Sequence, residues 1–185
     1  MIKDVIADMN GHMDKSIESL RKEYQRVRTG RASTSLLDEI RVEFYGAISP
    51  LSQVATLAVP EPRTITIQPW DAKMISVIEK AIMNSNLGLT PANDGKVIWL
   101  ILPPLTEERR KDIVKQLKRD AEEAKVALRN IRRDANDRLK KLEKEKSITE
   151  DELKRAEKDV QDFTNSHSAK IDEVFQHKEK EVMEV

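Results

Sequence analysis

The sequence contains no cysteine and little glycine or proline. Without cysteine, the 185-residue chain can form no disulfide bond, no thiolate metal site and no cysteine nucleophile. Glycine and proline number only 5 and 7, whereas charged residues make up 36%. This composition is typical of long, solvent-exposed helices rather than of an enzyme with many functional loops. We therefore expect a mainly helical protein that is stabilised by packing alone.

Long apolar runs are absent as well. The longest aliphatic or aromatic run, Val97 to Leu102, has six residues, whereas a membrane-spanning helix needs roughly 20. The N-terminus, Met1 to Ile6, is amphipathic and mixed in charge, and it lacks the basic stretch, apolar core and cleavage site of a secretion signal. These features predict a cytoplasmic protein with no membrane partner.

Motifs for catalysis and metal binding are missing too. The sequence has no glycine-rich phosphate loop and no nucleophile elbow. Its three histidines, His12, His167 and His177, are scattered. The last two lie roughly 15 Å apart along one predicted helix, too far to share a metal ion. We expect no enzyme activity, cofactor, metal site or small-molecule substrate, and we interpret His167, which follows an apolar register, as a core residue.

Apolar residues recur every three or four positions in three long segments, which predicts three amphipathic helices. The segments are 2–27, 113–142 and 153–182. Thr106 caps the second helix just after Pro103-Pro104, and Thr149 with Glu152 forms a capping box that opens the third. Helices of 30 to 40 residues are roughly 45 to 60 Å long, so we predict an elongated, antiparallel three-helix bundle.

Between the first and second helices the pattern changes to that of a small α/β domain. Residues 40–45 and 64–68 alternate with strand periodicity, and Asn93-Asp94-Gly95 marks a turn before a strand at 96–102. Residues 72–83 predict a short helix, with Asp71 as its cap.

The predicted domains follow from this order. Residues 1–30 and 105–185 form the bundle, and residues 31–104 form the inserted, β-rich domain. Two short links, 29–31 and 103–106, join them. They consist of Thr29, Gly30 and Arg31, and of Pro103, Pro104, Leu105 and Thr106. Such links predict a hinge between the domains, with a rigid, packed junction as the alternative.

The formal net charge is zero, but its parts are unequal. Residues 105–146 contain 15 basic and 10 acidic side chains, whereas residues 147–185 contain 6 and 11. Antiparallel helices with this asymmetry attract each other where they touch and present opposite potentials where they face away. Net charge therefore neither favours nor excludes an anionic partner.

Basic side chains line one stripe of the second helix. Taking Leu128, Ile131 and Ala135 as its buried face, the side chains of Lys125, Arg129, Arg132 and Asn136 fall about 100° away, and Arg133 lies just beyond. Arginines can grip RNA phosphates with paired hydrogen bonds, and they can equally form ion pairs with the acidic third helix. Spacing leaves both interpretations open. Arg26, Arg28, Arg31, Arg109 and Arg110 form a weaker cluster with the same ambiguity.

Several segments together resemble the bacterial ribosome recycling factor family. They are Val27–Ala32, Ser35–Leu37, Phe44–Gly46, Glu79–Met83, Leu87–Leu89, Pro103–Lys111 and Arg129–Ala135. The likeness runs the full length of the chain, in the family's segment order. One departure is Trp99, at a position where a polar or basic residue is expected.

The resemblance implies a monomeric α+β protein of two domains in an L shape. Such a factor binds the post-termination ribosome and, with elongation factor G and GTP hydrolysis by that partner, splits the ribosome into subunits. This step releases mRNA and tRNA. The bundle lies on large-subunit rRNA, and the small domain rotates about the hinge. The implied RNA-binding residues are Arg132, Arg129, Arg133, Lys125, Arg28 and Arg31.

Two other classes of protein fit the pattern less well. A coiled-coil adaptor would use its apolar stripes to form a dimer, and sedimentation would reveal it. A hydrolase in the inserted domain would need a nucleophile motif, which the sequence does not contain.

Overall fold

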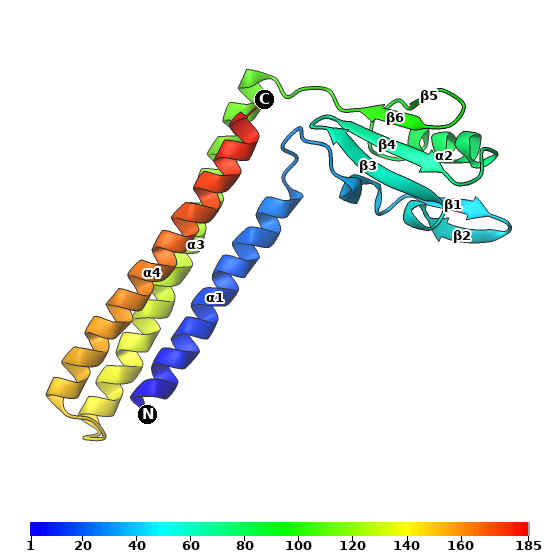
Figure 1. The fold of residues 1–185 in the computed structure, drawn as a ribbon. Coiled ribbons are helices and arrows are strands. Elements are labelled where there is room, and N and C mark those ends of the chain that lie inside the picture. Colours follow the sequence, from blue (N-terminus) through cyan, green and yellow to red (C-terminus); the bar gives the residue numbers. More distant parts are fainter. Residues whose placement is uncertain (185) are drawn as a thin grey trace. The chain divides into compact units, whose positions relative to one another are not determined.

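The computed structural model describes residues 1–184 and divides the chain into two compact units. The first, which we call the bundle, consists of Met1–Arg28 and the chain from Thr106 onward. The second, which we call the insert, is Thr29–Leu105. Figure 1 shows long helices in the bundle, and strands with one shorter α-helix in the insert.

Three long helices make up the bundle. They are α1 (Ile2–Arg26), α3 (Glu107–Lys144) and α4 (Glu150–Met183). Each helix contacts the other two (Figure 1). At 1.5 Å rise per residue, the 38 residues of α3 span about 57 Å. The predicted three-helix bundle with an inserted α/β domain is confirmed.

Contacts between the helices define their directions. Helices α3 and α4 run antiparallel, because Lys125 contacts Asp172 and Arg132 contacts Gln161. Helix α1 also runs antiparallel to α3, since the hydroxyl of Tyr24 donates to the carbonyl oxygen of Leu117 at 2.6 Å while Asp8 pairs with Arg138. Helices α1 and α4 are therefore parallel.

The core of the bundle follows the predicted apolar registers. Helix α1 buries residues at steps of three and four from Val5 to Tyr24, and α3 and α4 do the same. Apolar burial of this kind is the main favourable term in folding. The apolar stripes that a dimerising coiled coil would need are therefore buried within one chain.

Side-chain caps fix the beginnings of two helices. The Thr106 hydroxyl accepts a hydrogen bond from the Arg109 amide at 3.1 Å. Thr149 and Glu152 form the predicted capping box at the start of α4. At the end of α3, Lys146 adopts a positive φ of 57° and the Ser147 amide donates to the Leu142 carbonyl oxygen, the pattern of a Schellman motif.

The insert contains two antiparallel sheets. One is the hairpin of β1 (Arg41–Phe44) and β2 (Ala47–Pro50). The other has the strand order β3-β4-β6-β5. Its strands are β3 (Ala55–Glu61), β4 (Thr64–Pro69), β5 (Ala92–Asn93) and β6 (Ile98–Ile101). Short 3₁₀ turns at Thr34–Leu37 and Leu51–Gln53 flank the hairpin.

Helix α2 (Met74–Met83) packs its apolar face into the core of the insert. Ile78 and Ile82 from the helix belong to the same buried cluster as Ile67 of β4 and Ile98 of β6, and all four are fully buried. The insert therefore has a core of its own.

Some sequence predictions for the insert were wrong in detail. Strands β2, β3 and β5 were not predicted, because β3 is a mostly exposed edge strand with an internal proline and β5 has only two residues. Helix α2 begins at Met74 instead of residue 72, and its N-cap is Lys73 rather than Asp71. The Asp71 carboxylate instead accepts a hydrogen bond from the Lys73 amide at 3.0 Å.

The two links to the bundle lie close together at Gly30 and Leu105. Gly30 has a φ of +77°, and a Cβ added there would lie 3.1 Å from Cγ of Leu105. A side chain at this position would be strained by the positive φ and would crowd Leu105.

Candidate RNA-binding surface

Two basic side chains of α3 contact α4 directly. The Lys125 ammonium lies 2.7 Å from the Asp172 carboxylate, and the Arg132 guanidinium donates a hydrogen bond to the Gln161 side-chain carbonyl at 3.1 Å. Because both are partly buried, they mark the flank of α3 that lies beside α4. We call this the α4-side flank.

Arg129 and Arg133 occupy the outer part of the same flank. Both are exposed, and neither forms an ion pair or hydrogen bond with any residue in the described range 1–184. Their guanidinium groups are permanently charged and have five donors each. These two arginines are available to an anionic ligand.

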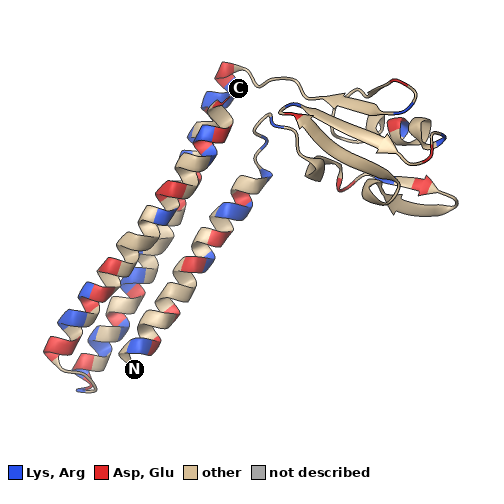
Figure 2. Ribbon diagram, viewed as in Figure 1, with Lys and Arg blue, Asp and Glu red and all other residues tan. Residues whose placement is uncertain are grey.

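The middle of α4 carries few charged side chains. Residues 163–169, between Gln161 and Asp172, include no Asp, Glu, Lys or Arg, although α4 as a whole is rich in these residues (Figure 2). Arg132 contacts the neutral amide of Gln161, just before Asp162 and this interval, instead of a carboxylate. The sequence left open whether these basic residues form ion pairs with the acidic helix. Within residues 1–184, Lys125 does so, whereas Arg129, Arg132 and Arg133 do not.

An ion pair with a carboxylate would have cancelled the charge on Arg132. A hydrogen bond to Gln161 orients the guanidinium but leaves its positive charge uncompensated. The same contact uses one of five donors, so the others remain free to bind a phosphate. Arg132 therefore presents an oriented, positively charged guanidinium group that can bind an anion.

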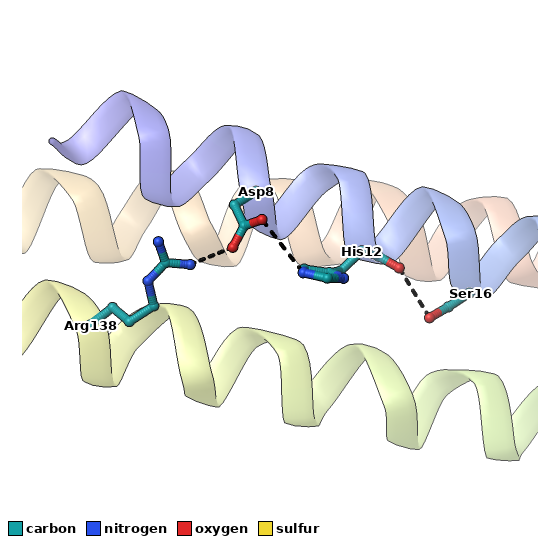
Figure 3. A network of polar contacts seen from close by, with 4 residues as sticks. All are labelled: Asp8, His12, Ser16 and Arg138. Atoms are coloured by element: carbon teal, nitrogen blue, oxygen red, sulfur yellow. Dashed lines mark hydrogen bonds and ion pairs between the residues drawn. The ribbon is translucent and has the colours of Figure 1, made fainter.

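The opposite flank of α3, which lies beside α1, has a different electrostatic character. In Figure 3, Arg138 pairs with Asp8, whose other oxygen lies 3.5 Å from the His12 ring, and the Ser16 hydroxyl donates to the His12 carbonyl oxygen. A cavity of about 300 Å³ beside this network is also lined by Asp134. The carboxylates here neutralise Arg138.

A second cavity on the α1 side, of about 350 Å³, is lined by Glu23, Asp120 and Glu123. Carboxylates would repel RNA phosphates at this flank. The α4-side flank, by contrast, presents Arg129 and Arg133 without a neighbouring carboxylate contact in the described chain.

The remaining predicted residues are divided between the two units. Arg28 is exposed and belongs to the bundle, whereas Arg31 is exposed and belongs to the insert. Arg26 pairs with Glu23 at 3.3 Å. Arg109 is exposed, and Arg110 is partly buried with its Nε lacking a hydrogen-bond partner in the described part of the chain.

Asn136 and Trp99 are both partly buried and are not exposed like Arg129 and Arg133. Asn136 is partly buried, and its Oδ1 has no hydrogen-bond partner within residues 1–184. Trp99 lies in β6, paired with Thr66 of β4 and Ala92 of β5, and is partly buried.

His167 is a buried residue of the bundle. Its Nε2 lies 2.9 Å from Asp14 of α1, and its Nδ1 lies 2.7 Å from the Phe163 carbonyl oxygen. The Nε2 contact therefore holds α4 to α1, whereas the Nδ1 contact lies within α4. Across residues 1–184, no three His, Asp or Glu side chains are placed to hold a metal ion, and no helix there could cross a membrane.

Gln161 is a surface residue that sequence reasoning missed. The stretch 163–169, which has no Asp, Glu, Lys or Arg, can be read from the sequence. The contact of Gln161 with Arg132, however, depends on the register between α3 and α4, which the sequence pattern does not reveal.

Comparison with known proteins gives a consistent result. The family model described as Ribosome recycling factor matches residues 20–183. The ribosome-recycling factors of Citrifermentans bemidjiense and Geobacter sulfurreducens are 82% and 75% identical to this chain, and each match covers the whole of both chains.

Solved structures agree with the sequence relatives. A solution structure of the ribosome recycling factor is 42% identical and matches with a TM-score of 0.71, over 100% of this chain and 98% of the other. A second match, 48% identical with a TM-score of 0.62 and full coverage of both chains, comes from models of the T. thermophilus ribosome recycling factor and E. coli elongation factor G bound to the E. coli post-termination complex. Its fold, its family match and its full-length relatives together show that this chain belongs to the ribosome recycling factor family.

Proposed function

We propose that this protein acts in the cytoplasm on the post-termination ribosome. Together with elongation factor G and GTP hydrolysis by that partner, it splits the ribosome into subunits and releases mRNA and tRNA. Family membership supports this proposal, as does the structural relative that is placed with elongation factor G on a post-termination complex. Members of this family are translation factors rather than enzymes, so the partner supplies the energy.

The observation that carries the binding step is the uncompensated charge on the α4-side flank. Arg129 and Arg133 are exposed without ion pairs in the described chain, and Arg132 is oriented by a neutral side chain. Arginine is suited to phosphate because its planar fork donates two parallel hydrogen bonds. We propose that this flank binds large-subunit rRNA, with Arg132 as its centre.

We propose that the other predicted residues contribute to RNA binding to different extents. Lys125 contributes less, because its charge is already paired with Asp172. Arg28 and Arg31 lie next to the first link, one in each unit, and we propose that they contact RNA near the hinge. The burial of apolar stripes within one chain supports a monomer.

The insert is proposed to transmit motion. Two short links join it to the bundle, and one of them contains Gly30 with its positive φ. Link residues that absorb backbone rotation are typical of hinges. We propose that 29–31 and 103–106 form the hinge about which the insert moves when the GTPase acts.

A matched pair of arginine variants tests the binding step. Arg132→Gln should weaken binding to isolated large ribosomal subunits by about 10- to 100-fold, because a charge-assisted hydrogen bond is worth about 1.5–3 kcal/mol. Arg138→Gln, on the same helix but paired with Asp8, should bind like the unchanged protein. Binding can be measured by co-sedimentation, and circular dichroism should show equal helicity for both variants.

The splitting step is tested on the same proteins. Subunit dissociation should require elongation factor G and GTP, and Arg132→Gln should reduce it. Splitting without the GTPase, or equal binding by the two variants, would contradict the proposal.

A further inference from the structure

Gln161 of α4 contacts two other side chains at once. Its side-chain carbonyl oxygen accepts a hydrogen bond from the Arg132 guanidinium at 3.1 Å, and its amide nitrogen donates to Oδ1 of Asn165 at 2.8 Å. Asn165 follows four residues later on the same helix, a spacing at which side chains meet. The three side chains therefore form a hydrogen-bond chain that leads from α3 onto α4.

Arg132 fixes the direction of both hydrogen bonds in this chain. A guanidinium group can only donate, so Gln161 must turn its carbonyl oxygen toward α3. The amide nitrogen of Gln161 then points to Asn165, which must present its own carbonyl oxygen. A flipped Gln161 amide would place two donors face to face at Arg132. Only one orientation of the Gln161 amide therefore satisfies both contacts.

The position of Arg132 matters because an arginine side chain is long and flexible. A freely moving arginine loses rotamer freedom when it binds a phosphate, and this loss opposes binding. Arg132 is partly buried and is held by Gln161 in the absence of any ligand. Arg129 and Arg133 are exposed and have no such contact within residues 1–184. Arg132 is therefore the arginine of this flank that is ordered in advance.

We propose that Gln161 is a positioning residue for RNA binding by Arg132, and that Asn165 holds the Gln161 amide in the required orientation. This inference rests on the proposed rRNA-binding function. The positioning side chain needs an acceptor that orients the guanidinium, and it must be neutral so that the charge stays available to a phosphate. Glutamine has both properties. Methionine keeps the neutrality without the acceptor, and glutamate keeps the acceptor without the neutrality.

A double-mutant cycle on the full-length protein tests this inference, with isolated large ribosomal subunits as the ligand. Gln161→Met preserves length and helix propensity, and it should weaken binding by about 2- to 10-fold because one hydrogen bond is lost. In the Arg132→Gln background the same change should have no effect, since the group that Gln161 positions is gone. Gln176→Met is the matched control, because Gln176 is an exposed glutamine of α4 with no hydrogen-bond partner in the described chain. It should bind like the unchanged protein.

Gln161→Glu separates orientation from charge. Its carboxylate should pair with Arg132, so the melting temperature should stay equal or rise while binding to large subunits weakens. A purely structural role of Gln161 would not lower affinity while stability is kept. Asn165→Ala removes an exposed amide contact between residues four apart, and it should weaken binding by no more than about twofold.

Each possible failure has its own meaning. If Gln161→Met binds as tightly as Gln176→Met while Arg132→Gln binds weakly, Arg132 needs no positioning and the proposed function stands. Equal weakening by Gln161→Met in both backgrounds would show that Gln161 acts independently of Arg132. Unchanged binding by Gln161→Glu would refute the need for a neutral partner, and a larger loss from Asn165→Ala than from Gln161→Met would refute the role of Asn165. If Arg132→Gln itself binds normally, the proposed RNA contact fails as well.

Discussion

At the scale of single residues, Tyr24 ties α1 to α3 by a buried contact. Its hydroxyl donates to the Leu117 carbonyl oxygen at 2.6 Å, and the side chain is only 3% exposed. Removal from water raises the pKa of the Tyr24 phenol, and the nearby Asp120 carboxylate raises it further. Both effects oppose formation of a phenolate inside the folded bundle.

This environment predicts a loss of stability at alkaline pH. Because the folded pKa of Tyr24 lies above its ordinary value of 10.0, the contribution of Tyr24 is fully present below that value and is lost as pH rises above it. Tyr24→Phe should cost about 1 kcal/mol at neutral pH through the missing hydrogen bond, and its stability should fall less above pH 10. Urea unfolding at several pH values measures both effects. An identical alkaline loss in both proteins would exclude this role for Tyr24.

The arginines show what single-residue reasoning leaves undecided. Helical spacing placed Arg129, Arg132 and Arg133 on one side of the second predicted helix, but it left phosphate binding and internal ion pairing equally open. The structure gives Lys125 an acidic partner and Arg132 a neutral one. That difference depends on which residues of α4 lie opposite, and no local pattern encodes it.

At the scale of elements, helix α4 depends on its first turn. The Thr149 hydroxyl accepts from the Glu152 amide at 3.2 Å, and the Glu152 carboxylate accepts from the Thr149 amide at 2.7 Å. These bonds satisfy two amides that have no partner within the helix.

Loss of this cap should destabilise the bundle. We expect Thr149→Ala to lower the free energy of unfolding by about 1 kcal/mol, since its hydroxyl has no substitute. Ser166→Ala, at an exposed position inside the same helix, should be neutral or slightly stabilising because alanine favours the helix interior. Thermal unfolding followed by circular dichroism compares the two variants. Equal melting temperatures would show that the cap does not matter.

The strands were harder to predict than the helices. Strands β4 and β6 bury alternate residues and were recognised by that period, whereas β3 has one buried residue at its start and is otherwise mostly exposed. Edge strands owe their pairing to a neighbour, here β4, rather than to their own apolar pattern. Alternation of apolar and polar residues therefore predicts central strands more readily than edge strands.

At the scale of the whole molecule, the protein consists of two cores joined by two short links. Leu117 is fully buried in the bundle, and Ile67 is fully buried in the insert. Each core is built from residues of its own unit, so damage to one need not spread to the other.

Core truncations should therefore separate binding from splitting. Ile67→Ala should cost about 2–5 kcal/mol in the insert, and Leu117→Ala a similar amount in the bundle. We expect Ile67→Ala to increase hydrogen exchange in the insert alone, to keep large-subunit binding and to lose splitting. Leu117→Ala should instead impair binding. Mass spectrometry of exchanged peptides locates each effect, and loss of protection in both units from either change would refute their independence.

The sequence by itself determined the three helices, their caps, the apolar registers and the two-link connection, because these depend on the spacing of residues along one chain. Only the tertiary structure decided which side chains of α4 lie beside the arginines. That register is set when apolar residues of both helices pack together, and it places the neutral Gln161 against Arg132, where a carboxylate would have cancelled the charge. The candidate surface exists because packing, which no single segment encodes, leaves those guanidinium groups uncompensated.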